Sequence, residues 1–231
     1  MTGNRNAVLD TLAKRIALTS PERVLRVAID GRTASGKTTL ADELAAFIEA
    51  NGRPVIRTSI DGFHRPKIER YARGRHSAEG YYLDARDLGA INTMLLGPLG
   101  PTGIRLYRTT SFDLDADKPI EQEPQLAPAD AVLIVDGTFL QRPELSDGWD
   151  LTIFIATSES VAEQRGVGRD ADRPGGEDAA RELFAQRYRP AFDLYDRLCS
   201  PEQSADVIVN NDDFSSPELQ FREQGRLVDQ D

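Results

Sequence analysis

The sequence has a single cysteine and lacks both long apolar runs and an excess of positive charge. Because Cys199 stands alone, no intrachain disulfide can form, which is typical of proteins in the reducing cytoplasm. No apolar run approaches the roughly 20 residues that a membrane span needs. The first 18 residues also lack the basic, apolar and small-residue order of a secretory signal. We therefore expect a cytoplasmic protein with no membrane partner.

The formal net charge is −10 over 231 residues. A surface this acidic repels the backbones of DNA and RNA, so a general nucleic-acid-binding function is not expected. It repels free nucleotides as well. Any phosphate site must therefore be built from local hydrogen-bond donors, a few basic side chains and a divalent cation.

Short apolar runs alternate with helical patterns along the chain. Four runs predict buried strands, at 24–29, 54–60, 131–136 and 151–156, and a shorter fifth lies at 206–209. The helical patterns lie at 37–50, 84–96, 158–168 and 177–198. Such alternation is typical of parallel strands with right-handed crossovers, and near-continuous apolarity suits strands covered on both faces. The pattern predicts an α/β fold of three layers, with a mostly parallel sheet of about five strands.

Three other segments differ from this pattern. The apolar positions within residues 1–20 predict an N-terminal amphipathic helix; they are Val8, Leu9, Leu12, Ile16 and Leu18. Residues 97–128 are rich in proline and glycine and predict a small hairpin and loop insertion beside the main sheet. The polar tail, 217–231, predicts a short helix or a frayed end. No repeat or low-complexity linker interrupts the chain, so we expect a single domain over 1–231.

The stretch AIDGRTASGKTTLADEL, residues 28–44, carries a phosphate-binding pattern. Gly31, Gly36, Lys37 and Thr38 fit G-x-x-x-x-G-K-[ST], between an apolar strand and a helical pattern. Glycines let the backbone curl so that successive N–H groups point at one anion, and the helix that follows adds its dipole. A chance lysine in a glycine-rich turn is the alternative, but strand, turn and helix agree here. The pattern predicts a P-loop that binds a nucleoside triphosphate.

The roles within this loop follow from its chemistry. Lys37 is expected to reach the β- and γ-phosphates, and the Thr38 hydroxyl to ligate Mg²⁺. The backbone around these two residues is expected to hold the phosphates of ATP. The other residues expected to bind the nucleotide are Gly31, Thr33, Ala34, Ser35, Gly36 and Thr39.

Two aspartates follow predicted strands. Asp136 ends the strand at 131–136, where P-loop proteins place a carboxylate in or behind the metal shell. Asp61 follows the strand at 54–60, and if the sheet is parallel both carboxylates face Lys37 at one edge. A carboxylate at Asp61 can take the proton of a hydroxyl that attacks the γ-phosphorus. The alternative for either residue is an ordinary Asp-Gly turn.

Arginines gather within and just before the segment VGRDADRPGG, residues 167–176. Arg165, Arg169 and Arg173 precede the Gly175–Gly176 pair, which suits a lid over 165–177 that closes over phosphates and opens for product release. The alternative is a solvated helix end, because the charges in RDADR alternate in sign.

Taken together, GRTASGKTT, DGFHRP and PADAVLIVDG resemble the uridine kinase group of P-loop kinases, which also includes phosphoribulokinase and bacterial pantothenate kinase. The resemblance continues through YYLDARDL, IRLYRTTSFD, VGRDADRPGG and the segment from RYRPAFDLYD to VNNDD, so that it covers roughly residues 22–213. It implies a three-layer P-loop fold with hairpin and lid insertions.

The resemblance also implies roles for single residues. Asp61 becomes the general base, and Asp84 a contact for sugar hydroxyls. Tyr107, in the hairpin, is the aromatic residue that covers a base. Arg165, Arg169 and Arg173 would neutralise the transferring phosphoryl group, with Lys37 and Arg169 acting on the reacting atoms.

The acceptor loop departs from the family pattern at His64. His64 either contacts a substrate hydroxyl or packs on Phe63. The loop that follows is unusually basic; its cationic residues are Arg65, Lys67, Arg70, Arg73 and Arg75. These cations attract an anionic acceptor or pair with the acidic surface. Tyr81 and Tyr82 offer aromatic area beside this loop, Tyr82 as a candidate acceptor contact, although core packing is expected for at least one of them.

The sequence therefore predicts a kinase that uses ATP and Mg²⁺ to phosphorylate a small-molecule alcohol. Uridine or cytidine is the first choice of acceptor, and pantothenate, a sugar or another ribosyl compound is the nearest alternative. A nucleotide-dependent switch or assembly factor is the rival from another class, although it would need no acceptor pocket. Association into a homo-oligomer is compatible with the sequence.

Overall fold

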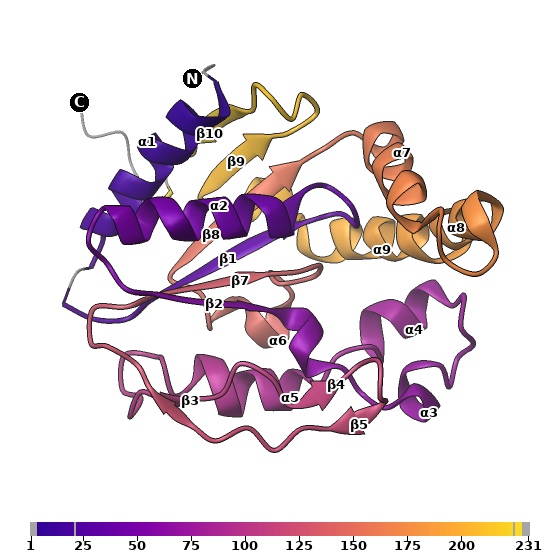
Figure 1. The fold of residues 1–231 in the computed structure, drawn as a ribbon, viewed down its shortest axis with the longest axis horizontal. Coiled ribbons are helices and arrows are strands. Elements are labelled where there is room, and N and C mark those ends of the chain that lie inside the picture. The colour runs from indigo at the N-terminus through magenta and orange to yellow at the C-terminus, as the bar shows by residue number, and fades with distance from the viewer. Residues whose placement is uncertain (1–3, 21, 224, 228–231) are drawn as a thin grey trace.

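The computed structural model describes residues 4–20, 22–223 and 225–227 and centres on one twisted sheet (Figure 1). The described residues place six strands in this sheet, five of them parallel, with the last one antiparallel at an edge. From that edge, the order is β10 (Glu218–Phe221), β9 (Val207–Asn210), β8 (Leu151–Ala156), β1 (Leu25–Gly31), β7 (Val132–Asp136) and β2 (Val55–Ser59).

The mostly parallel α/β sheet that the sequence predicts is confirmed, but the expectation for the tail is wrong. Instead of a helix or a frayed end, Glu218–Phe221 pairs antiparallel with β9. Leu219 is 4% exposed and alternates with the exposed Glu218 and Gln220, the period-two pattern of an edge strand. The strand was not predicted because polar residues surround its short apolar pattern. Residues 224 and 228–231 of the predicted tail lie outside the described residues.

Two helices cover the first face of the sheet. α1 (Arg5–Leu18) is capped by the Asn4 side chain, and α2 (Lys37–Ala50) follows the glycine-rich loop. Figure 1 shows both lying side by side across the strands. Their apolar stripes pack on alternate residues of β1, such as Val27 and Ile29. The predicted N-terminal helix is confirmed from Arg5 on, and residues 1–3 lie outside the described part.

The second face is covered by shorter elements, because the intervening strand residues point that way. Ala28 and Leu133 pack against the segment formed by α5 and η2, and Phe154 packs against α4 and α9. The elements of this half are η1 (Ile60–Phe63), α3 (Lys67–Arg70), α4 (Ala78–Leu83), α5 (Leu88–Ile91), the π-helical η2 (Asn92–Leu96), α6 (Pro143–Ser146), α9 (Arg189–Cys199) and α10 (Pro201–Ser204).

The helical patterns predicted near 158–168 and 177–198 form one connected arm. It consists of α7 (Glu159–Asp170), α8 (Gly176–Leu183) and the π-helical η3 (Phe184–Tyr188), which leads into α9. The predicted lid, 165–177, is the end of α7 and the turn before α8. Gly175 and Gly176 have φ values of +95° and +63°, a left-handed geometry that glycine adopts at little cost.

The predicted insertion, 97–128, is a nested pair of two-stranded sheets rather than one hairpin. β4 (Phe112–Asp113) pairs with β5 (Lys118–Pro119), and β3 (Leu106–Tyr107) pairs with β6 (Gln125–Leu126). In Figure 1 these strands lie beyond β2. Across the described residues, no helix combines the length and the apolar character that crossing a membrane requires.

Candidate active site

The glycine-rich loop joins the fully buried strand β1 to α2, as the motif predicts. Gly36 has φ +97°, and a Cβ there would lie 2.5 Å from Nδ2 of Asn211, so a side chain at this position is both strained and obstructed. No side chain caps α2. Its first backbone N–H groups are therefore left to an external anion, which is the geometry of a phosphate cradle.

Lys37 lies at the base of this loop, almost fully buried. Its Nζ donates to the carbonyl oxygen of Arg32 at 2.6 Å. Burial lowers its pKa to about 8, although the nearby carboxylates of Asp30, Asp136 and Asp61 work in the opposite direction. The ammonium is thus held near three carboxylates, including both of those that the sequence singled out.

Thr38 and Asp136 form the predicted pair at the metal position. The Thr38 Oγ1 donates to the Asp136 Oδ2 at 2.6 Å. The other carboxylate oxygen, Oδ1, lies 2.7 Å from Nη1 of Arg57, whose Nε donates to Asp42 on α2 at 2.8 Å. Arg57 therefore fixes the carboxylate of Asp136 from the side opposite to Thr38.

This donor set fits Mg²⁺. Hydroxyl and carboxylate oxygens are the hard ligands that Mg²⁺ prefers. The described residues contain no cluster of three or more acidic, histidine or cysteine side chains that could enclose a metal. Mg²⁺ in phosphate sites retains waters and phosphate oxygens as ligands, so one carboxylate and one hydroxyl are a sufficient protein contribution.

Asp61 lies on η1, directly after β2. Its Oδ1 accepts from Nη2 of Arg86 at 2.5 Å, while its side chain is 62% exposed towards the cavity. Enclosure by the surrounding residues opposes ionisation, but the Arg86 guanidinium outweighs it, so the pKa of Asp61 lies below its usual value. The carboxylate is therefore ionised and held in place on one oxygen.

His64 contacts both members of this pair. Its Nε2 lies 2.6 Å from Nη1 of Arg86, and its Nδ1 lies 2.8 Å from the carbonyl oxygen of Asp61. Because a guanidinium only donates, Nε2 accepts and Nδ1 carries the proton. Burial and the charge of Arg86 lower the pKa of His64 to about 4, which agrees with this neutral tautomer. Both ring nitrogens are thus occupied by protein atoms.

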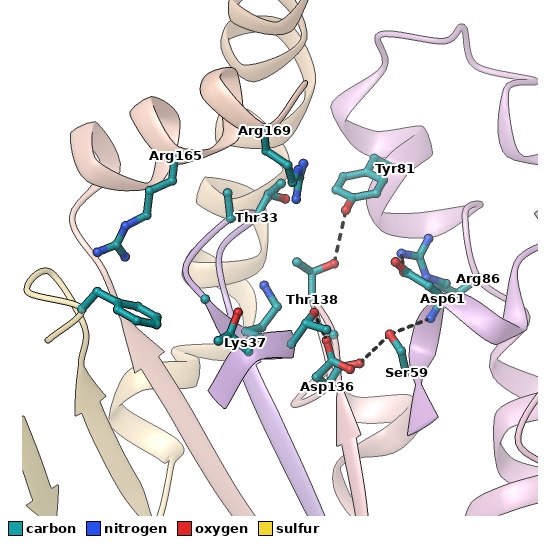
Figure 2. Close-up of a pocket in the computed structure, with 16 residues that line it drawn as sticks. Thr33, Lys37, Ser59, Asp61, Tyr81, Arg86, Asp136, Thr138, Arg165 and Arg169 are labelled. Atoms are coloured by element: carbon teal, nitrogen blue, oxygen red, sulfur yellow. Dashed lines mark hydrogen bonds and ion pairs between the residues drawn. The ribbon is translucent and has the colours of Figure 1, made fainter. Parts of the chain in front are cut away.

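The two aspartates and the loop meet in one cavity of about 490 Å³. Figure 2 shows Lys37 and Asp136 at its centre, Asp61 on one side and Arg165 on the other. The predicted residues that line it are Thr33, Ala34, Gly36, Lys37, Thr38, Thr39, Asp61, Asp136, Arg165 and Arg169. Ser35 is buried beneath them, and its backbone carbonyl accepts from Asn211 at 2.8 Å.

The arm supplies the arginines. Arg169 enters the cavity from α7 and pairs with Asp170 at 2.9 Å. Arg165 donates to the backbone carbonyls of Asn211 and Asp212, both at 2.9 Å. Arg173 lies further out and pairs with Asp170 at 3.3 Å. Two of the three predicted arginines therefore lie on the cavity wall, and the third lines a neighbouring cavity.

Four predicted acceptor residues are absent from the lining of this cavity: His64, Asp84, Tyr82 and Tyr107. Asp84 pairs with Arg73 at 2.9 Å, and Tyr107, 7% exposed, donates to Gln125. Tyr82 is 5% exposed and packs edge-on against Phe139, which confirms core packing for one tyrosine of the pair. The roles of Asp84, Tyr82 and Tyr107 stay predictions.

Several lining residues were not predicted. Arg86, Thr138, Ser59 and Phe214 line the cavity together with Tyr81, whose hydroxyl lies 3.4 Å from that of Thr138. Arg86 stands within the quoted YYLDARDL, but an arginine among charged neighbours gives no local sign that it will reach Asp61. Phe214 follows the last acidic run, where an isolated aromatic residue suggests packing rather than a ligand contact.

The fold and the site define a P-loop protein in which a second carboxylate shares the cavity with the loop lysine. No family model matches the chain. In sequence it is 25% identical to uridine-cytidine kinase B of Dictyostelium discoideum over 184 residues, 79% of this chain and 73% of that protein. It is 23% identical to uridine kinase-like protein 5 of Arabidopsis thaliana over 79% of its own length, and spans 38% of that relative.

Solved structures show the same fold. A possible uridine kinase from Bacillus stearothermophilus superposes with a TM-score of 0.69 at 24% identity, covering 88% of this chain and 97% of that one. A putative fructose transport system kinase from Silicibacter sp. TM1040 gives 0.65 at 22% identity, covering 83% and 95%. The chain thus has the P-loop kinase fold and resembles the uridine kinases, as the sequence motifs predict.

Proposed function

We propose that this chain is an ATP-dependent kinase that transfers the γ-phosphate to a hydroxyl group of a small molecule. The observation that carries the proposal is the shared cavity: the Asp61 carboxylate lines the same space as Lys37 and the phosphate-binding loop. The named curated relatives are kinases, which supports the same reaction class. The overall reaction is ATP plus an alcohol giving ADP and a phosphate monoester.

Each residue has a role that its contacts support. Asp61 is ionised and orients the attacking hydroxyl, whose proton it accepts. Lys37 and Arg169 stabilise the negative charge on the transferring group, and Arg165 stands on the nucleotide side of the cavity. Thr38 and Asp136 would hold Mg²⁺, which would neutralise charge on the β- and γ-phosphates. Positioning and electrostatics supply most of the acceleration in reactions of this kind.

Two classes of acceptor are candidates. The names of the curated relatives favour uridine or cytidine, with the 5′-hydroxyl as the reacting group. An anionic alcohol such as pantothenate is the second class, and the arginines near Asp61 favour it. A sugar or another ribosyl compound would undergo the same chemistry.

The test measures ADP formation by the purified chain with ATP and Mg²⁺, with and without uridine, cytidine, pantothenate and a hexose. A kinase consumes ATP in an acceptor-dependent way, whereas a nucleotide-dependent switch hydrolyses it slowly whatever alcohol is present. Equal ADP formation with and without every acceptor would contradict the proposal.

Two substitutions assign the roles. Lys37→Ala should abolish turnover and weaken ATP binding. Asp61→Asn should preserve ATP binding yet reduce kcat by roughly 10²–10⁴-fold, the usual contribution of a general base. A near-normal kcat in the Asp61→Asn variant would remove this residue from the mechanism.

A further inference from the structure

A second cavity of about 420 Å³ adjoins the first. The two share part of their walls, including Asp61, Arg86 and Arg169, so a molecule in the second cavity can reach the carboxylate at the first. Six arginines line the second cavity against one carboxylate, Asp61. These arginines are Arg70, Arg75, Arg86, Arg169, Arg173 and Arg187.

Arg187 is the most informative of these arginines. It lies on the π-helical turn η3, a feature found frequently at functional sites, and is 7% exposed. Its guanidinium stacks near the rings of Tyr81, at 4.6 Å, and Tyr71, at 5.4 Å. Across the described residues no carboxylate lies within 4.0 Å of it, and its buried Nε has no hydrogen-bond partner.

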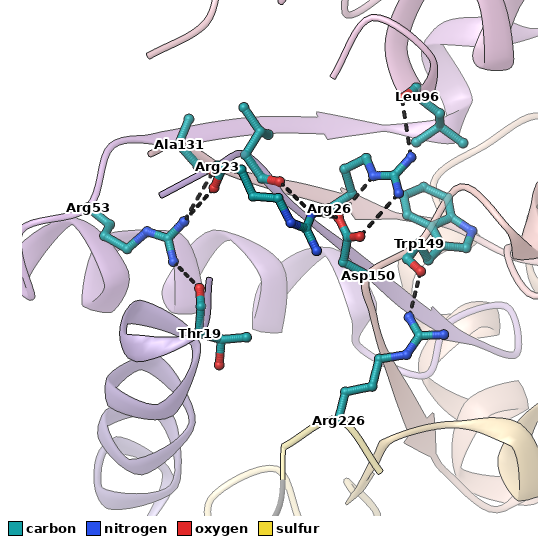
Figure 3. Close-up of polar contacts among 10 residues, drawn as sticks. Thr19, Arg23, Arg26, Arg53, Leu96, Ala131, Trp149, Asp150 and Arg226 are labelled. Atoms are coloured by element: carbon teal, nitrogen blue, oxygen red, sulfur yellow. Dashed lines mark hydrogen bonds and ion pairs between the residues drawn. The ribbon is translucent and has the colours of Figure 1, made fainter. Parts of the chain in front are cut away.

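Two buried arginines elsewhere in the chain have close hydrogen-bond partners for their guanidiniums (Figure 3). Arg26 forms two hydrogen bonds to the carboxylate of Asp150, at 2.9 and 3.1 Å. Arg53 donates from all three of its nitrogens to backbone carbonyls, the shortest contact being 2.6 Å to Thr19. A buried guanidinium without a counter-charge costs free energy. Arg187 therefore departs from the way this fold satisfies its structural arginines.

The neighbouring charges do not neutralise the cavity. Arg70, 3% exposed, has Asp117 at 3.4 Å, while Arg169 and Arg173 share the single carboxylate of Asp170. With Asp61, three carboxylates stand against six guanidiniums. This excess of positive charge also acts on Tyr71. Burial raises the pKa of the Tyr71 hydroxyl, but contacts with Arg187 and Arg70 outweigh burial, so that the pKa lies below its usual value. The chain carries a net charge of −10, so this is a local concentration of positive charge.

We infer that the phosphate acceptor is an anionic alcohol, whose carboxylate or phosphate group binds Arg187 and Arg70 while its hydroxyl lies at Asp61. The inference rests on the proposed kinase function and names its substrate class. A guanidinium can bind two oxygens of a carboxylate or of a phosphate group at once, through paired hydrogen bonds. Arg70 and Arg187 line only the second cavity of the two, so ATP in the first does not account for them.

The test compares acceptors of different charge with ATP and Mg²⁺. Glycerate and pantothenate supply the carboxylate, glycerol 3-phosphate and ribose 5-phosphate supply the phosphate, and uridine and a hexose are neutral. We expect one anionic class to give the highest kcat/KM. A neutral acceptor that exceeds every anionic one would overturn the inference, and the better anionic arm identifies which group is bound.

Substitution of Arg187 sharpens the test. Arg187→Gln should raise KM for the anionic acceptor about tenfold or more and leave KM for ATP within about twofold. Arg181→Gln is the matched control, since Arg181 on α8 is exposed and pairs with Glu177 on the same helix. Arg187→Lys, which keeps the charge, should restore part of the loss. Unchanged KM for the anionic acceptor in folded Arg187→Gln would overturn the inference.

Calorimetry separates the two proposals. The anion site is supported if an anionic alcohol binds the native protein but not the Arg187→Gln variant. If such binding is seen and no phosphate is transferred, only the kinase proposal fails. Acceptor-dependent ADP formation with uridine alone has the opposite meaning: the kinase proposal stands and the anionic acceptor is wrong.

Discussion

At the scale of single residues, we expect the ionisation of Lys37 to govern binding of the nucleotide. Burial lowers its pKa to about 8 in the absence of phosphates. A triphosphate binds the protonated form, so affinity is full below this pKa and decreases as the pH rises through it. We expect the Kd for ATP to increase roughly tenfold between pH 7 and pH 9.

Titration with a fluorescent ATP analogue over this range checks the prediction. Lys37→Arg is the control, because a guanidinium stays charged throughout. Its Kd, whatever its absolute value, should be nearly independent of pH. A native Kd that stays constant from pH 7 to pH 9 would show that Lys37 does not lose its proton there.

Arg86 sets the ionisation of Asp61. Because the guanidinium lowers the pKa of this carboxyl, its removal leaves enclosure by the cavity, which raises it. Arg86→Gln should therefore shift the acid limb of the kcat/KM profile upward by about one pH unit or more. Rate profiles from pH 4 to pH 8 measure this, with Arg181→Gln as the unchanged reference. If the acid limb lies at the same pH in both variants, Arg86 does not control the pKa of Asp61.

Phe214 and Arg165 both line the first cavity, and we expect them to lie on the side that takes the nucleotide. The ring of Phe214 is 44% exposed and is held by the Arg5 guanidinium, whose Cζ lies 3.9 Å from the ring centroid. An exposed aromatic face at this place suits a stacked base, worth about 1–3 kcal/mol. We expect Phe214→Ala to raise KM for ATP roughly fivefold to a hundredfold and to leave KM for the acceptor unchanged. Steady-state kinetics with each substrate varied in turn measure both.

At the scale of elements, α7 packs against the phosphate-binding loop through Gly166. A Cβ there would lie 2.0 Å from Cζ of Phe184 and 3.2 Å from Cβ of Ala34. Gly166→Ala should therefore displace the Phe184 ring or α7 itself, costing about 1–3 kcal/mol of unfolding free energy, and should raise KM for ATP by altering the contact between α7 and Ala34 of the loop. Gly168→Ala is the matched control, because nothing lies within 4 Å of its Cβ position.

Urea unfolding and KM for ATP test this pair of variants. The control alanine sits in the same helix and should stabilise it by up to about 1 kcal/mol, since alanine favours helix more than glycine does. Equal stability and equal KM in the two variants would mean that the contact between α7 and the loop is not tight.

The elements also show what the sequence could and could not predict. The strands β1, β7 and β8 were predicted because continuous apolar runs are a local signal. Lys37 and Thr38 were predicted because one loop fixes their spacing from Gly31 and Gly36, and Asp136 because it ends a predicted strand. β10 was missed because only two apolar residues carry it. Arg86 and Arg187 were not predicted because their roles depend on contacts with Asp61 and Tyr81, 25 and 106 positions away in the chain.

At the scale of the whole molecule, the arginines at the two ends of the parallel strands have different partners. Arg26 and Asp150, with exposed side-chain fractions of 8% and 10%, form a buried pair near the amino ends of the strands, and Arg23 contacts the same carboxylate at 3.0 Å. Burial opposes ionisation of Asp150, but its bonds to Arg26 outweigh this and lower its pKa. The stabilisation is therefore complete at neutral pH and is lost only as the pH falls below about 4.

Asp150→Asn should destabilise the fold by about 3 kcal/mol at pH 7, since it leaves a buried guanidinium without its counter-charge. KM for ATP should not change, because the pair is remote from the cavity. Asp10→Asn is the control: it breaks an exposed pair with Lys14 and should cost less than about 1 kcal/mol. Urea unfolding measures both, and a similar loss in the two variants would contradict the structural role.

The amide of Asn211 has a consequence for synthesis of the chain. It follows the last parallel strand, donates to the carbonyl of Ser35, and accepts from Arg5 at 3.3 Å. The predicted phosphate-binding loop is thus held by a residue that lies 176 positions later in the chain than Ser35. A nascent chain, folding from its amino end, lacks this contact until residue 211 has emerged. We therefore expect ATP to stabilise the loop fully only in nascent chains that extend past residue 211.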